Sequence, residues 1–140
     1  MILRYFKRTI LATSLLFLIG AGVAFAGVQA RGGKLLSVQS GSMVPQLHKG
    51  DLVAVTHVPS SQLAVGDIVT YVNPKNKKQT ITHRIIQLPS KANYNKFIVK
   101  GDANNAADAP VDSSFILGKL DFKAAGLGYA VDFEIGRAHV

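Results

Sequence analysis

The segment Ser40-Gly41-Ser42-Met43-Val44-Pro45 contains residue types that can carry out covalent chemistry. It follows an apolar run at 35–39 and places serine hydroxyls on a turn that contains glycine. Such a turn exposes the hydroxyl and leaves backbone N–H groups nearby, which acyl transfer needs for attack and for stabilising the oxyanion. A Ser-Gly-Ser sequence is also a common surface turn, so by itself it favours a purely structural role.

Three later segments supply the groups that a serine nucleophile requires. They are Val65–Tyr71, Ile81–Ile85 with His83, and Lys100–Asp108 with two aspartates. A serine hydroxyl is a weak nucleophile and needs an adjacent base, and histidine accepts and returns protons near neutral pH. A carboxylate on the other ring nitrogen fixes the tautomer and stabilises the imidazolium. These segments therefore favour a serine hydrolase.

In their order and spacing, the four segments resemble the conserved boxes of type I signal peptidases, peptidase family S26, from about Val38 to Asp112. Most bacterial members place a lysine base where this sequence has His83. The chain is therefore similar to the Ser–His branch found in the endoplasmic reticulum, in archaea and in some spore-forming bacteria. The resemblance implies a membrane-bound serine endopeptidase that cleaves signal peptides from exported preproteins at small-x-small sites.

The resemblance also implies roles for single residues. Ser42 matches the nucleophile, His83 the general base, and Asp108 the acid that orients the imidazole. Asp102 matches the aspartate of the Gly-Asp pair and is the alternative third member. If Asp108 takes that place, Asp102 would brace the turn, for example by a salt bridge to Arg84.

Substrate binding is implied by the same resemblance. Ser40, two residues before the nucleophile, would bind the oxyanion together with the backbone N–H of Ser42. The preprotein would lie as an extended strand along Leu36–Gln39 and along Ile81–Arg84, with shallow pockets that admit small side chains.

Several nearby side chains have competing explanations. Met43, Val44 and Leu47 are either core residues or an apolar surface at the membrane, and the resemblance favours the surface. His48 is either a rival base or a solvated loop residue, the second being favoured.

Three other residues have side chains that could act as a base, but we expect each of them to have a structural role. His57 ends a predicted strand and is expected to be structural. Lys77 and Lys78 would be lysine bases, but we expect them in the turn before the strand that carries His83.

An uncharged run of 20 residues at 9–28 predicts a membrane-spanning helix, because that length spans about 30 Å. Arg4, Lys7 and Arg8 precede it, which favours a cytoplasmic tail at 1–8 and an extracytoplasmic remainder. The alternative is a cleaved signal peptide with its cleavage site at 24–26, Ala-Phe-Ala. The length of the apolar run favours a retained anchor in the cell membrane.

Beyond a polar linker at 29–34, short β-branched runs separated by turn residues predict a mainly β catalytic domain at 35–121, a barrel or sandwich of the signal-peptidase type. The predicted strands are Leu35–Gln39, Asp51–His57, Asp67–Asn73, Gln79–Leu88, Lys96–Lys100 and Ser114–Asp121. Apolar residues on both faces of 51–57 indicate a strand buried on two sides. Residues 122–133 suit the approach to a second membrane helix, and 134–140 read as a non-native tail.

Composition narrows the function further. The 140 residues include no cysteine, which excludes disulfides, thiolate zinc sites and cysteine nucleophiles. The formal charge is +8, but the one dense basic cluster, at 75–78, contains no aromatic side chain, so nucleic acid is not an expected partner. No motif indicates a metal or an organic cofactor. The expected partners are signal peptides and the lipid bilayer, and accessory subunits are left open.

Three other functions are compatible with parts of the sequence. A self-cleaving repressor would share the broad fold, but it would need a DNA-binding domain where this chain has an apolar segment. A secreted β-rich binding or matrix protein would leave the serine, histidine and aspartate segments unexplained. The third is an inactive, truncated signal-peptidase relative that has kept the catalytic residues.

Overall fold

The computed structural model describes residues 1–129, so the expected non-native tail lies outside the described residues, and the expected approach at 122–133 lies partly outside them. The chain divides into two compact units, Met1–Gly32 and the residues from Gly33 onward.

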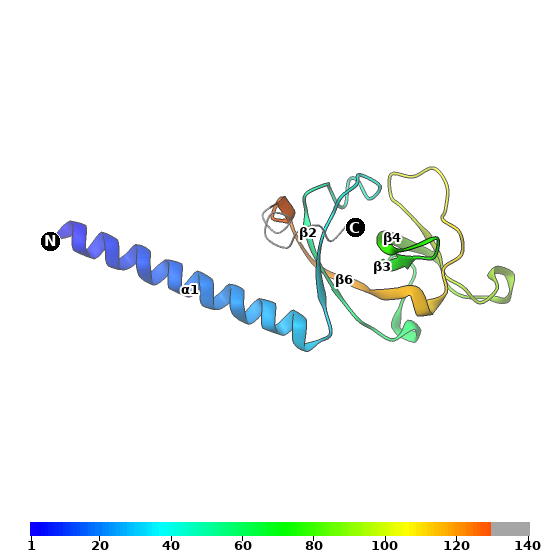
Figure 1. Ribbon diagram of the computed structural model, residues 1–140, viewed down its shortest axis with the longest axis horizontal. Helices are drawn as coiled ribbons and strands as arrows, with labels where there is room; N and C mark the ends of the chain where they lie inside the picture. Colours follow the sequence, from blue (N-terminus) through cyan, green and yellow to red (C-terminus); the bar gives the residue numbers. More distant parts are fainter. Residues whose placement is uncertain (130–140) are drawn as a thin grey trace. The chain divides into compact units, whose positions relative to one another are not determined.

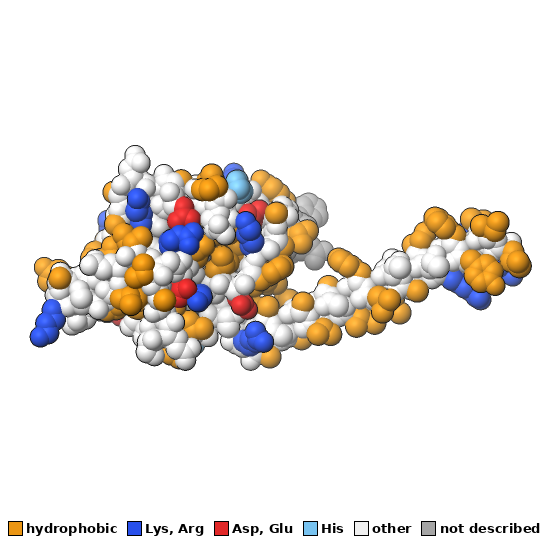
Figure 2. Space-filling model, turned by 180° about the vertical axis from the view of Figure 1, so that it is seen from behind, with side chains coloured by type: hydrophobic (Ala, Val, Ile, Leu, Met, Phe, Trp, Pro, Cys, Tyr) orange, Lys and Arg blue, Asp and Glu red, His pale blue; other side chains and the backbone are white. Residues whose placement is uncertain are grey.

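The first unit is one helix, α1 (Ile2–Ala30), whose side chains are almost all exposed. A window of 18 residues within it has a mean hydropathy of 2.1, and the helix is long and apolar enough to cross a membrane. Figure 2 shows apolar side chains along its length and Lys and Arg side chains near its N-terminal end. A cleavable signal sequence would have the same features, so the helix alone does not separate the two explanations given above.

The second unit is built on an antiparallel sheet of six strands, which confirms the mainly β prediction. The strands are β1 (Lys34–Ser37), β2 (Leu52–Thr56), β3 (Ile68–Asn73), β4 (Asn76–Gln87), β5 (Ile98–Lys100) and β6 (Ile116–Ala124). Each overlaps one of the predicted segments. Their order in the sheet is β1-β2-β6-β3-β4-β5, so the last strand of the chain lies between β2 and β3 (Figure 1).

β2 lies inside the sheet and is buried on both faces. β2 pairs with β1 on one side and with β6 on the other, and Val53, Ala54 and Val55 are all buried, as the sequence predicted. The core has two clusters. One surrounds Tyr71, Ile85 and Phe97, and the other surrounds Met43, Leu47 and Val53.

β4 is longer than predicted and has one partly free edge. It pairs with β3 from Asn76 to Arg84, whereas β5 covers its other edge only from Arg84 to Gln87. In the described part of the chain, no strand pairs with residues 76–83 on that second side. An unpaired edge exposes backbone donors and acceptors to which another chain can add.

Candidate active site

Ser42 lies in the turn segment that connects β1 to β2, and buried side chains hold this segment in place. Met43 and Leu47 are 2% and 0% exposed, and Leu47 N–H donates to the Met43 carbonyl at 2.9 Å. The prediction that Met43 and Leu47 form an apolar surface is therefore wrong, because both side chains fill the second core cluster. Val44, in contrast, is 37% exposed. The two buried anchors leave Ser42 half-buried at the protein surface.

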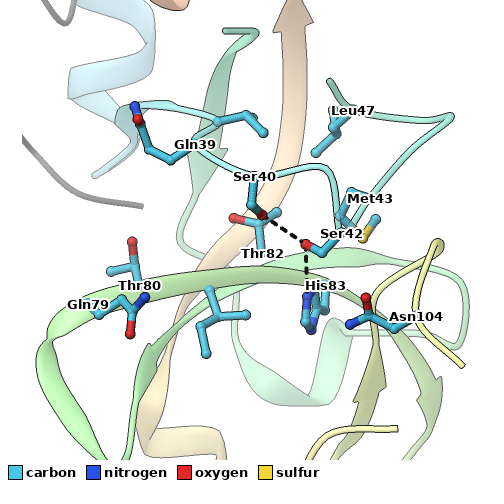
Figure 3. Close-up of a pocket in the computed structure, with 12 residues that line it drawn as sticks. Gln39, Ser40, Ser42, Met43, Leu47, Gln79, Thr80, Thr82, His83 and Asn104 are labelled. Carbon is cyan, nitrogen blue, oxygen red and sulfur yellow. Dashed lines mark hydrogen bonds between the residues drawn. The ribbon is translucent and has the colours of Figure 1, made fainter. Parts of the chain in front are cut away.

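His83 lies on β4, opposite Val69 of β3, and is 6% exposed. Its Nε2 is 3.2 Å from Oγ of Ser42, and Oγ of Ser42 is also 3.2 Å from Oγ of Ser40 (Figure 3). The sheet fixes the imidazole, since β4 is paired with β3 at this position. A histidine in contact with a serine hydroxyl can take up the hydroxyl proton.

Asp108 lies on the loop after β5 and contacts the other side of the same imidazole. Its Oδ2 forms a hydrogen bond with Nδ1 of His83. The phenolic hydroxyl of Tyr71 donates to that same oxygen at 2.7 Å. The structure therefore brings Ser42, His83 and Asp108 together in one chain of contacts.

Asp102 is not part of this chain of contacts. Its two carboxylate oxygens accept from Nε and Nη2 of Arg84 at 2.8 and 2.6 Å, and Nη1 of Arg84 donates to the Gly66 carbonyl at 2.8 Å. The hydrogen bonds from Arg84 lower the pKa of the Asp102 carboxyl and raise the pKa of Arg84. The salt bridge that the sequence left open is thus present, and it ties the 101–108 turn to β4.

The same turn also packs directly on the nucleophile segment. The N–H of Ala103 donates to the Ser42 carbonyl at 2.9 Å. A Cβ at Gly101 would lie only 2.7 Å from that carbonyl oxygen and 2.7 Å from Nδ2 of Asn104, so glycine is required for this close approach. Backbone contacts therefore connect the segments of the serine and the two aspartates.

A cleft of about 250 Å³ lies beside Ser42 and His83. One wall comes from the segment 38–43 with Leu47, and the other from residues 79–83 of β4 with Asn104 on one side (Figure 3). Both segments to which the sequence assigned substrate binding, 36–39 and 81–84, contribute residues to this cleft.

The alternative bases do not line this cleft. His48 is exposed, and its backbone N–H donates to Asp51 at 2.9 Å. Lys77 and Lys78 are exposed on β4 itself and not in the turn, so that prediction of their location is wrong. The turn contains Pro74 and Lys75 only, because β4 begins at Asn76. Lys78 lies about 17 Å along the strand from His83.

Sequence reasoning missed three polar residues of this site. Tyr71 was given no role of its own, although a buried tyrosine needs a hydrogen-bond partner for its hydroxyl. Asn104 lines the cleft, and no sequence signal separates it from Asn105. Oγ1 of Thr80 is buried without a hydrogen-bond partner among residues 1–129, which only coordinates reveal. Within the same residues, no group of three or more His, Asp or Glu side chains is placed to hold a metal ion.

Comparison with known proteins agrees with this arrangement. The family described as signal peptidase, peptidase S26, matches residues 5–100, which is more than half of the chain. The chain therefore belongs to the peptidase S26 signal peptidase family.

Its relatives come from bacteria and from eukaryotes. Signal peptidase I W of Bacillus subtilis is 39% identical over 79 residues, 55% of this chain and 40% of that protein. The human signal peptidase complex catalytic subunit SEC11C is 36% identical over 75 residues, 53% of this chain and 38% of the relative. SEC11 of Metarhizium acridum is 40% identical over 75 residues, covering 53% and 43%. The chain thus matches less than half the length of each of these relatives.

Proposed function

We propose that this chain is a membrane-anchored serine endopeptidase that removes signal peptides from exported preproteins at small-x-small sites. The observation that carries the proposal is the contact chain from Ser42 through His83 to Asp108, found in a member of the signal peptidase family. A half-buried serine next to a buried imidazole has the arrangement that acyl transfer needs.

In the proposed mechanism, Oγ of Ser42 attacks the scissile carbonyl while Nε2 of His83 takes the hydroxyl proton. The tetrahedral intermediate collapses, the C–N bond breaks, and His83 gives the proton to the leaving amine. The signal peptide is then an ester on Ser42. Water, deprotonated by His83, attacks this ester, and the released Ser42 oxygen regains a proton.

The proposed oxyanion hole consists of Oγ of Ser40 and the backbone N–H of Ser42. Support comes from the 3.2 Å separation of the two serine oxygens, since this places a second hydroxyl beside the atom that attacks. Of the two aspartates, Asp108 is the proposed third catalytic member because it contacts His83. Asp102 is proposed to act through the turn that it braces with Arg84.

The substrate is proposed to add as a strand to the free edge of β4. Ile85 exchanges backbone hydrogen bonds with Gly66 and Asp67 on the β3 side, so alternate residues direct their backbone groups to opposite sides. Thr80 and Thr82 therefore direct their N–H and C=O groups toward the free edge. Backbone pairing there would accept many sequences, while the cleft walls limit side-chain size.

The helix α1 is proposed to anchor the enzyme in the cell membrane, with residues 1–8 in the cytoplasm and the catalytic domain outside. Arg4, Lys7 and Arg8 at its start support this orientation. Anchoring would concentrate the enzyme and its substrates in one two-dimensional phase. The further division into a linker at 29–34, a catalytic domain at 35–121 and a helix approach at 122–133 stays a prediction.

The test is cleavage of a labelled preprotein with an Ala-x-Ala site by the membrane-inserted chain. Ser42→Ala and His83→Ala should each abolish cleavage without unfolding the domain, because each removes a reacting group. Ser61→Ala, at an exposed position, is the matched control. Near-normal cleavage by the first or second variant would refute its assignment. Activity in native membranes that disappears on purification would reveal a need for other subunits.

A further inference from the structure

We propose that Tyr71 is a positioning residue of this active site, whose hydroxyl holds the Asp108 carboxylate in the orientation that His83 needs. The observation is a shared acceptor. Oδ2 of Asp108 accepts from the phenol of Tyr71 at 2.7 Å and also contacts Nδ1 of His83. This inference rests on the proposed function, since it assigns a support to the proposed triad.

Tyr71 and Asp108 differ in how firmly the fold holds them. Tyr71 is 2% exposed, lies in the middle of β3 and packs in the first core cluster. It pairs with Ile81 of β4, two residues before His83. Asp108, by contrast, is on a loop, where its backbone N–H donates to the Val99 carbonyl at 2.9 Å. The phenol therefore fixes a carboxylate, carried on a loop, to the same pair of strands that carries the imidazole.

The chemistry of the phenol suits it to this support. Burial and the neighbouring Asp108 carboxylate both raise the pKa of Tyr71, so its hydroxyl stays protonated and acts as a donor. A hydroxyl that donates to a carboxylate draws negative charge away from the oxygen that faces the imidazole. Tyr71 therefore affects both the orientation of Asp108 and the strength of its attraction for a protonated His83.

Other charged groups near this cluster stay the same when the hydroxyl is removed. Asp102 interacts electrostatically with His83, Arg84 and Lys100, and Lys75 lines a cavity together with Tyr71 and Asp108. Among the described residues, the hydroxyl of Tyr71 donates to Asp108 and to none of these other groups. A change at His83 in a variant that lacks only this hydroxyl therefore reports on the hydrogen bond between Tyr71 and Asp108.

The test is Tyr71→Phe, which keeps the buried ring and removes only the hydroxyl. In the full-length, membrane-inserted protein, kcat for preprotein cleavage should fall about five- to twentyfold with KM unchanged. Tyr94→Phe is the matched control, because Tyr94 is 83% exposed. In the Asp108→Asn background, Tyr71→Phe should cause no additional loss, since the two groups act together.

A second measurement does not depend on turnover. The ring nitrogens of His83, labelled with ¹⁵N and identified by their loss in His83→Gln, should change resonance in Tyr71→Phe and stay unchanged in Tyr94→Phe. An unchanged His83 spectrum in Tyr71→Phe would overturn the proposal. So would a variant that has a lower melting temperature but the same kcat. If no preprotein is cleaved while the His83 resonances respond, the proposed function fails and the positioning role stands.

Discussion

Oγ of Ser42 lies 3.2 Å from Nε2 of His83, although the two residues are 41 positions apart in the sequence. Two different parts of the fold bring them together. Pairing between β3 and β4 fixes the imidazole, and the buried side chains of Met43 and Leu47 fix the serine. The nucleophile is thus placed by packing in one core cluster, and its base by a strand next to the other.

The first prediction separates the two aspartates. Asp108→Asn should lower kcat by about a thousandfold or more, because the amide cannot accept from His83 as the carboxylate does. Asp102→Asn should instead lower the stability by about 1 kcal/mol, since its partly exposed pair with Arg84 is lost, and should affect kcat less. Steady-state kinetics and urea unfolding of both variants make the comparison. A larger loss of kcat in Asp102→Asn would exchange the two roles.

The second prediction concerns the contact of the 101–108 turn with the nucleophile segment. Gly101→Ala would place a Cβ 2.7 Å from the Ser42 carbonyl oxygen, so the turn must move away. We expect a loss of about 1–3 kcal/mol in stability and a lower kcat. Gly41→Ala is the stability control, because the nearest atom to its added Cβ is a Val44 methyl carbon at 3.7 Å. Unfolding curves for the two variants should differ clearly, and equal curves would contradict the close approach.

The fold was more predictable from the sequence than the site. All six strands follow from apolar runs bounded by turn residues, since that pattern is local. The strand order, with β6 between β2 and β3, is not local and was not predicted. The roles of Ser42, His83 and Asp108 were predicted from a family resemblance, whereas the sequence pattern alone does not show which aspartate meets the imidazole.

The mistaken predictions have physical causes. Met43 and Leu47 were expected at the surface because the family resemblance implies substrates that stay in the bilayer while they are cut. A turn with no regular structure, however, needs buried anchors to hold a side chain in place. Lys77 and Lys78 were expected in a turn because they are charged. They lie on β4, where the strand edge and an exposed face tolerate lysine.

The third prediction concerns acid stability. Asp51 accepts from the backbone N–H of His48 at 2.9 Å and of Gly126 at 3.1 Å, and the first of these bonds is the main reason that its pKa is lowered from 3.8. A lowered folded-state pKa stabilises the protein above the unfolded value, and this stabilisation is lost as the pH falls through the folded value. Asp51 should therefore contribute fully at neutral pH and progressively less below about pH 4.

Unfolding in urea between pH 7 and pH 2.5 measures this contribution. Asp51→Ala should be less stable than the unaltered protein by about 2 kcal/mol at pH 7, because two backbone donors lose their acceptor. The difference should shrink as the pH falls. Asp121→Ala, at an exposed carboxylate on β6, serves as the comparison. A stability difference for Asp51→Ala that is constant from pH 7 to pH 2.5 would show that the charge of Asp51 is not the cause.

The last prediction uses the buried hydroxyl of Thr80. Its Oγ1 has lost contact with water and has no partner among the described residues, which is unfavourable for the free protein. Thr80→Val keeps the shape of the side chain and removes the unpaired group, so the free protein should gain about 1 kcal/mol of stability. Thr80 lines the cleft at the free edge of β4, where a bound peptide would supply the missing partner. KM for the preprotein should therefore rise severalfold in the same variant, with kcat little changed.

Thr82→Val is the contrasting variant, because the hydroxyl of Thr82 is already bonded to Thr70 at 2.7 Å, and its loss should lower stability. A Thr80→Val protein that is more stable but has an unchanged KM would mean that the substrate leaves this hydroxyl unpaired.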